Sequence, residues 1–233
     1  MEKRGQLLAG LIKKLLPVLT VTTLLVAGML GQCLLFFRVS PESSQRTQAD
    51  LLSDWAIYTG RARALLLIPL IGAVAFAARM APELKIGFVR RNLKKSRDKC
   101  MIALRCAAVF AAPFTVIAAV LARPLLSAFF REGDVTAGAA LLQAGSACIL
   151  FYGLAAMLGS ILLSADKPGL LTGGVLAAIS IHLVALYGML VLMNGSVLAV
   201  VYAHLLLSVL LCAVLAAMVQ KNLRLRLNFY PLI

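Results

Sequence analysis

The sequence predicts an all-α, polytopic membrane protein, a class indicated by its composition and by the length of its apolar runs. Of its 233 residues, 62% are hydrophobic and 14% are charged, whereas a soluble domain carries about 25% charged residues. Six runs approach or exceed the length of about 20 residues that crosses a bilayer as a helix. They cover about 15–37, 64–82, 101–122, 139–164, 170–193 and 197–219. None alternates as a membrane β-strand does.

The placement of positive charge predicts how these helices cross the membrane. The chain carries 23 Lys and Arg residues and a net charge of +14. Most of these cations precede the first run, follow the sixth, or lie in the second and fourth connections. Because short cytoplasmic loops hold the excess of Lys and Arg, we expect a multi-pass protein of the cytoplasmic (inner) membrane with both termini in the cytoplasm. Nucleic-acid binding is not indicated, because no basic folded module remains outside the runs.

The first two helices are framed by prolines and a polar stretch. Pro17 is expected in the first turns of the helix over 15–37, where a missing N–H costs little. The segment SPESSQRTQADLLSD, residues 40–54, is the longest polar stretch and is expected to be an external loop. Thr59 is a candidate N-cap for the second helix, which carries Pro69 and Pro82 near its two ends.

The basic segment ELKIGFVRRNLKKSRDKC, residues 83–100, is predicted to be an amphipathic helix on the inner membrane surface. Ile86, Val89 and Leu93 recur at helical spacing, and basic residues occupy the other faces. Each basic residue near an anionic leaflet contributes about 1 kcal/mol of attraction. A simple solvated topology signal is the other interpretation, and the two are compatible.

The remaining helices follow from turn signals and small residues. Pro113 lies at the centre of the third helix and predicts a kink. RPLLSAFFREGD, residues 123–134, is expected to be an interfacial turn, and the fourth helix is rich in small residues that allow close helix contact. SADKPG, residues 164–169, and MNGS, residues 193–196, are expected to be tight turns on either side of the fifth helix.

His182 and His204 are the only two histidines, and both fall inside predicted helices. At about 1.5 Å per residue, each lies about 20 Å from the cytoplasmic end of its helix. A tight turn makes the fifth and sixth helices antiparallel neighbours, so the two rings would meet as a polar or proton-sensitive pair. The alternative is two unrelated histidines, each bonded to backbone or facing a cavity.

Three further polar residues occur in the predicted helices. Arg105 either snorkels to the headgroups or points into a cavity to hold a phosphate. Gln32 and Gln143 are expected to be buried amides, which join helices or contact a substrate.

No catalytic constellation is present. None of the nine acidic residues lies inside the six runs, and the G-x-S-x-G, H-E-x-x-H and phosphate-loop patterns are absent. The five cysteines include no C-x-x-C pair and are expected to pack as small hydrophobes. We therefore predict no enzymatic activity, no cofactor and no metal site.

Several segments resemble one lobe of the polysaccharide-transport flippases, in the branch of the multidrug/oligosaccharidyl-lipid/polysaccharide superfamily that includes stage V sporulation protein B. ALLLIPLIGAVAFAARMAPEL, with Pro69, Ala81 and Pro82, is similar to the second helix of such a lobe. ARPLLSAFF, residues 122–130, resembles the family's short external segment. GSILLSADKPG, with Lys167 and Pro168, is similar to its fourth-to-fifth connection.

The resemblance implies one six-helix lobe, most similar to the C-terminal one, of a cell-envelope transporter with two lobes around a central cavity. By alternating access, such a transporter moves lipid-linked oligosaccharide or polysaccharide precursors across the membrane. Pro17, Pro69, Pro82 and Pro113 would shape the helices along that cavity. The basic residues that would attract the substrate pyrophosphate are Arg79, Arg90, Arg91, Lys94, Lys95 and Arg105.

The expected partners are a lipid-linked saccharide, membrane lipids and a second six-helix lobe, from a separate chain or from a second copy of this one. Two other functions stay open. One is a non-transporting scaffold, a degenerate lobe that binds a partner. The other is a drug exporter of the same superfamily, although the absence of acids within the spans argues against a cation site.

Overall fold

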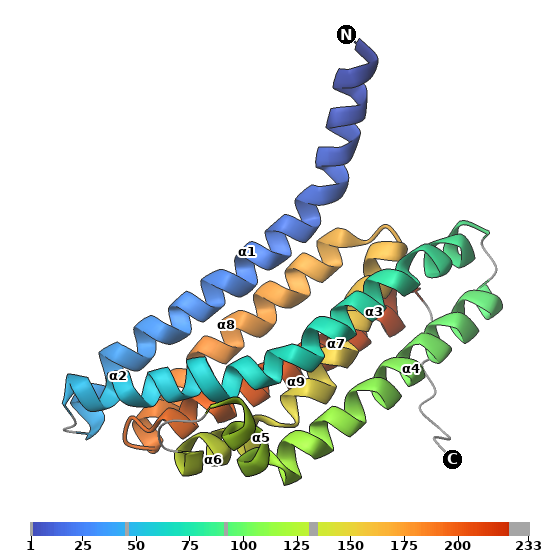
Figure 1. Ribbon diagram of the computed structural model, residues 1–233. Coiled ribbons are helices and arrows are strands. Elements are labelled where there is room, and N and C mark those ends of the chain that lie inside the picture. The colour runs from blue at the N-terminus through green and yellow to red at the C-terminus, as the bar shows by residue number, and fades with distance from the viewer. Residues whose placement is uncertain (1, 45–46, 91–92, 131–134, 224–233) are drawn as a thin grey trace.

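The chain folds into a bundle of helices (Figure 1). The computed structural model describes the backbone of residues 2–44, 47–90, 93–130 and 135–223, and their side chains except those of 2–14, 42–44 and 93–94. The elements are α1 (Glu2–Ser44), α2 (Gln48–Ile57), η1 (Tyr58–Ala62), α3 (Arg63–Val89), α4 (Leu93–Val120), α5 (Ala122–Phe129), α6 (Val135–Gly145), α7 (Cys148–Ser164), α8 (Pro168–Leu192) and α9 (Val197–Leu223). The described part of the chain contains no strand, which confirms the all-α class.

Five of the six predicted runs fall on single helices to within two residues, and the run over 139–164 is divided between α6 and α7 by a turn at residues 146–147. Five helical segments are long and apolar enough to cross a membrane. A sixth crossing results if α6 and α7, which meet at an angle of 43°, count as one bent span. The observed segments are longer than the apolar runs, because polar residues continue the helices at both ends. The largest, Gln48–Val89, is 42 residues long.

Several predicted boundaries are wrong for that reason. Pro17 lies inside α1 rather than in its first turns. The expected loop over 40–54 is mostly helical, and the cap near it is Thr47, whose hydroxyl oxygen accepts from the Asp50 N–H in a capping box. Thr59 is not an N-cap, since its hydroxyl donates to the Trp55 carbonyl within a continuous helix.

Two other segments also differ from expectation. The basic segment 83–100 is not a single interfacial helix: α3 continues to Val89, the chain turns, and α4 begins at Leu93. Leu84 and Cys100 of this segment are buried, whereas Ile86 and Val89, two of the residues that suggested an amphipathic helix, remain exposed. The segment 123–134, expected to be a turn, carries most of the short helix α5.

The bundle has two ends with different composition. The basic end carries the α3–α4 turn, the α7–α8 turn and the last turns of α9 (Figure 1, upper right). The opposite end, called the α5–α6 end, carries α2, α5, α6 and the α8–α9 turn. One apolar core lies toward each end, the first around Phe36, Leu142 and Val200 and the second around Leu84 and Ile161.

Candidate functional site

Two of the predicted anion-attracting residues, Arg79 and Arg105, lie at the same height along the bundle axis. The contacts between α3 and α4 fix their register: a Cβ on Gly72 would lie 3.0 Å from Phe110 Cζ, and one on Gly87 would lie 3.1 Å from Ser96 Oγ. This antiparallel alignment places Arg79 of α3 opposite residues 103–104 of α4, next to Arg105. Both arginines are exposed.

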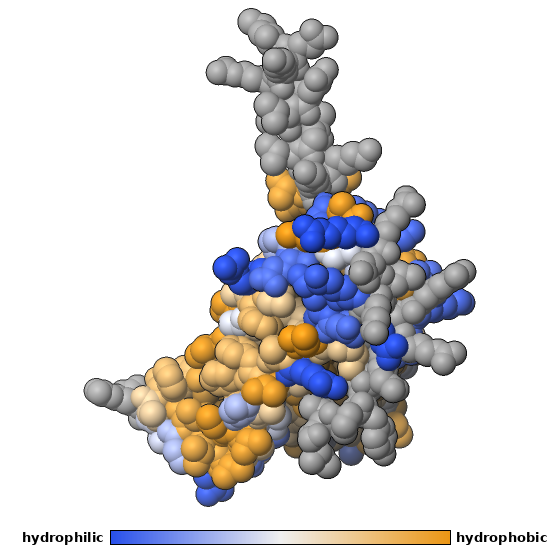
Figure 2. Space-filling model, turned by 90° about the vertical axis from the view of Figure 1, so that its right-hand side faces the viewer, coloured by the Kyte–Doolittle hydropathy of each residue, from blue (hydrophilic) through white to orange (hydrophobic). Residues whose placement is uncertain are grey.

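The other predicted basic residues lie nearer the α3–α4 turn. Arg90 is exposed at the C-cap of α3, and Lys95 is exposed in the first turns of α4. Arg91 and the side chain of Lys94 lie outside the described part of the chain. Arg90 is eleven residues beyond Arg79, or about 16 Å along a helix. The predicted cluster therefore occupies two levels, and Figure 2 shows the hydrophilic surface that gathers toward this end.

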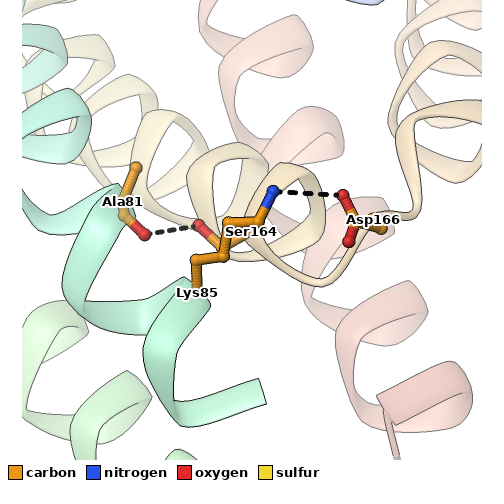
Figure 3. A network of polar contacts seen from close by, with 4 residues as sticks. All are labelled: Ala81, Lys85, Ser164 and Asp166. Carbon is orange, nitrogen blue, oxygen red and sulfur yellow. Dashed lines mark hydrogen bonds and ion pairs between the residues drawn. The ribbon is translucent and has the colours of Figure 1, made fainter. Parts of the chain in front are cut away.

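Cross-helix polar contacts hold α3 against α7 at the basic end. Ser160 Oγ donates to the Ala77 carbonyl at 2.8 Å, and Ser164 Oγ donates to the Ala81 carbonyl at 3.1 Å. Lys85 Nζ lies 3.6 Å from Asp166 Oδ1 (Figure 3). The two serines keep the same offset from their acceptors, so α3 and α7 run in parallel. With that offset, Tyr152 of α7 lies level with Pro69 of α3.

The two glutamines have different environments. Gln32 of α1 is buried, with 2% of its surface exposed, and its side chain lies beside Tyr58. Its amide nitrogen donates to no described residue. Gln143 is exposed on α6, so the prediction of a buried amide there is wrong. The prediction failed because α6 is a short separate helix with one exposed face, and Gln143 lies on that face.

The structure brings the two histidines together. The ring centroids of His182 on α8 and His204 on α9 are 6.5 Å apart, in a T-shaped arrangement. His182 Nδ1 lies 2.9 Å from the Ala203 carbonyl, and His204 Nε2 lies 3.2 Å from the Tyr152 hydroxyl. The tight turn at 193–196 produces this pairing, as the sequence suggested. Each ring also has a partner of its own, a backbone carbonyl for His182 and a tyrosine hydroxyl for His204.

These contacts set the hydrogen-bonding state of His182. A carbonyl only accepts, so His182 Nδ1 carries the proton, and in the neutral ring Nε2 is an acceptor. His182 Nε2 and His204 Nδ1 are both buried, and neither has a hydrogen-bond partner among the described residues. Buried polar atoms without partners are uncommon in folded proteins, which makes this pair a candidate site.

A small crevice opens beside the histidine pair. We call it the Arg63 crevice; it has an open volume of about 20 Å³ and is lined by Arg63, Leu66, Leu67, Leu70, Cys148, Ile149, Tyr152 and His204. That volume holds about one water-sized molecule. Arg63 extends to α1, where its Nη2 lies 2.8 Å from Met29 Sδ. A thioether is a weak acceptor for a guanidinium with five donors.

Sequence reasoning missed Arg63, Tyr58 and Tyr152 as parts of a site. Tyr58 is the first residue of a turn of π-helix, η1, and Arg63 follows its last residue. The turn inserts an extra residue into the helical repeat and re-aims the side chains around it. Helical periodicity does not reveal such a turn. The available signal was the position of Arg63, directly before the apolar run over 64–82.

The described residues offer no metal site, since they contain no group of three His, Cys, Asp or Glu side chains that is arranged to hold an ion. The five cysteines are free thiols. Cys100 and Cys148 are buried, Cys33 and Cys212 are half-buried, and Cys106 is exposed.

Comparison with known proteins adds no relative to these observations. The chain matches no protein-family model, no curated protein and no solved structure.

Proposed function

We propose that this bundle is one lobe of a transporter that moves a lipid-linked saccharide phosphate across the cytoplasmic membrane. The observation that carries the proposal is the pair of arginines at the two ends of the apolar stretch of α3. Arg63 and Arg79 are sixteen residues apart, or about 24 Å along a helix. That span approaches the bilayer hydrocarbon thickness of about 30 Å. One helix therefore offers a cation to a phosphate at each face of the membrane.

The chemistry of both arginines suits a phosphate headgroup. A guanidinium binds phosphate oxygens through two parallel N–H donors. Neither Arg63 nor Arg79 pairs with a carboxylate among the described residues, and the apolar runs contain no acid that would neutralise them. The same absence of acids disfavours an organic cation as substrate. The Arg63 crevice is too narrow for a phosphate to enter, so the headgroup would contact Arg63 at its mouth.

A transport cycle would use both levels. The headgroup would be captured beside Arg79 and Arg105 at the basic end, which the charge pattern assigns to the cytoplasm. It would be released beside Arg63, while the lipid tail stays in the bilayer. Alternating access of this kind needs a second bundle that rocks against the first. A separate chain or a second copy would supply it.

Flipping of a fluorescent lipid-linked saccharide in liposomes tests the proposal. The protein is reconstituted alone and together with any polytopic protein that copurifies with it. We expect Arg63→Gln and Arg79→Gln each to lower the flipping rate about tenfold or more, because a hydrogen bond to a charged group contributes about 1.5–3 kcal/mol. Arg63→Lys would lose less, because it keeps the charge.

Arg123→Gln is the matched control, since Arg123 is an exposed arginine of α5 at the same end as Arg63. It should leave the flipping rate within about twofold of wild type. Equal rates for wild type, Arg63→Gln and Arg79→Gln would contradict the proposal. Absence of flipping in all preparations, with a stoichiometric partner present, would favour the scaffold function instead.

A further inference from the structure

We propose that His182 and His204 form a binding site for one proton, and that an anion beside Arg63 and a proton on this pair promote each other's binding. The inference rests on the proposed function, because the anion is the phosphate headgroup of that proposal. According to this inference, the protein binds the headgroup and one proton together at the α5–α6 end.

The pair can accept one more proton, because two of its ring nitrogens make no hydrogen bond to the described residues. His182 Nε2 and His204 Nδ1 are the two ring nitrogens without a described partner, and His182 is 1% exposed. A proton from bulk water would bind to His182 Nε2 while Nδ1–H keeps its bond to the Ala203 carbonyl. The proton leaves a hydronium ion, which becomes water, and no other covalent bond forms or breaks.

The second step is that His204 can accept this proton's hydrogen bond. A tyrosine hydroxyl both donates and accepts, so Tyr152 pairs with His204 Nε2 in either tautomer of the ring. When His204 Nε2–H donates to the Tyr152 oxygen, His204 Nδ1 keeps a free lone pair that can accept a hydrogen bond. The ring centroids are 6.5 Å apart, and a single bridging water would complete the connection.

The third step concerns the charges around the pair. The titratable or charged groups beside it are Arg63 of α3, Cys148 and Tyr152 of α7, and Tyr58 of η1. On the α1 side, α8 contacts glycines, Gly28 against Ile179 and Gly31 against Leu183, with neutral Gln32 nearby. The described residues of α6 include no titratable side chain. No carboxylate therefore faces the pair from these elements.

Arg63 and His204 line the same crevice, so the only fixed charge beside the pair is positive and repels an added proton. An anion bound to Arg63 cancels that repulsion, and the proton in turn adds attraction for the anion. The coupling must be reciprocal, because both are binding equilibria of one molecule. Couplings between sites are typically about 5–150-fold.

Binding of dihexyl phosphate to the protein in nanodiscs tests the coupling. This phosphodiester carries one negative charge throughout the range in which histidine titrates, so a pH dependence reports the protein. Burial and the charge of Arg63 both oppose protonation of the pair, so the rise should come at lower pH than for a free histidine. We expect the affinity of the wild-type protein to rise about tenfold between about pH 6 and about pH 4. The affinity should show no such rise when both rings are replaced.

The replacement His182→Asn with His204→Gln is designed to keep the fold. The Asn amide places an N–H donor where Nδ1 meets the Ala203 carbonyl, and the Gln amide reaches the Tyr152 hydroxyl as Nε2 does. Neither amide titrates. The double variant should bind the phosphodiester with the wild-type affinity measured at about pH 6, at every pH of the series.

The outcomes separate the two proposals. Binding by wild type that is abolished in Arg63→Gln, but is equally tight at every pH, would overturn the proton site and leave the proposed function standing. A pH slope that persists in the double histidine variant would also overturn the proton site. No binding by wild type at any pH would contradict the proposed function, and the proton site that rests on it would fall too.

Discussion

The two ends of the bundle satisfy their polar groups in opposite ways. At the basic end, Ser160 and Ser164 donate to carbonyls of α3, and Lys85 pairs with Asp166 at the surface. Toward the α5–α6 end, Gln32, Tyr58 and His182 are buried, yet each keeps a polar atom without a described partner. The basic end is thus arranged to hold α3 and α7 together. The other end retains unused hydrogen-bonding capacity, which is what a binding site needs.

The backbone differs between the ends as well. The turn of π-helix interrupts the long helical segment only near the α5–α6 end, and π-turns are frequent at functional sites. Toward the basic end, α3 is an uninterrupted α-helix from Arg63 to Val89 despite Pro69 and Pro82. The predicted role of these prolines in shaping a cavity stays a prediction.

The largest expected effect is on stability, from Gly195→Ala in the α8–α9 turn. Gly195 has φ of +67°, and an added Cβ would lie 2.7 Å from Ser40 Cα of α1. Both the backbone strain and the clash oppose the substitution, so we expect a loss of about 3 kcal/mol. Thermal unfolding in detergent measures it.

Asp166→Gly at the opposite turn is the matched comparison. Asp166 also has a positive φ, of 54°, but its side chain is exposed and its pair with Lys85 is a surface contact. Glycine relieves the backbone while the lost ion pair costs little, so the change should stay within about 0.5 kcal/mol. A loss as large as that of Gly195→Ala would contradict the contrast between the two turns.

A smaller pair of effects should have opposite signs at the two ends. Ser160→Ala removes a buried hydrogen bond between α7 and α3 and should cost about 1 kcal/mol, with little change in flipping. Gln32→Met replaces an under-satisfied amide by an apolar side chain of similar size. It should leave stability unchanged or raise it, while it lowers flipping. The same two assays measure both variants.

The contrast would be wrong if Gln32→Met destabilised the protein as much as Ser160→Ala does. Its amide would then be a structural bond like those at the basic end. Unchanged flipping in Gln32→Met would separate Gln32 from the transport path without affecting the assignment of Arg63.

Sequence patterns predicted the six apolar runs, because burial in lipid requires long stretches without charge. They failed where helices extend beyond the lipid. Residues 38–44 and 83–89 continue α1 and α3 beyond the apolar runs that end at 37 and 82, even though Pro41 and Gly87 are poor helix formers. The expected interfacial helix over 83–100 became a hairpin, because Leu84 and Cys100 have buried positions between α3 and α4.

The candidate site was only partly predictable. The depth of His182 and His204 follows from the rise per residue, and their pairing from the tight turn between α8 and α9. Arg63 joins them because of the π-turn and because α1 approaches α3 at Met29, and both are tertiary features. Gln143 is a residue whose environment the sequence did not predict: its amide lies in an apolar run and was expected to be buried, but it is exposed.

Photocrosslinking at the Arg63 crevice tests the central claim most directly. A photoreactive residue replaces Leu67, which lines the crevice and is 41% exposed, or as a control Val184 of α8, which is 75% exposed. The account predicts that a lipid-linked saccharide phosphate crosslinks to position 67, that Arg63→Gln abolishes this product, and that position 184 labels weakly in both backgrounds. Equal labelling at the two positions, or labelling at 67 that survives Arg63→Gln, would contradict the claim that Arg63 holds the headgroup.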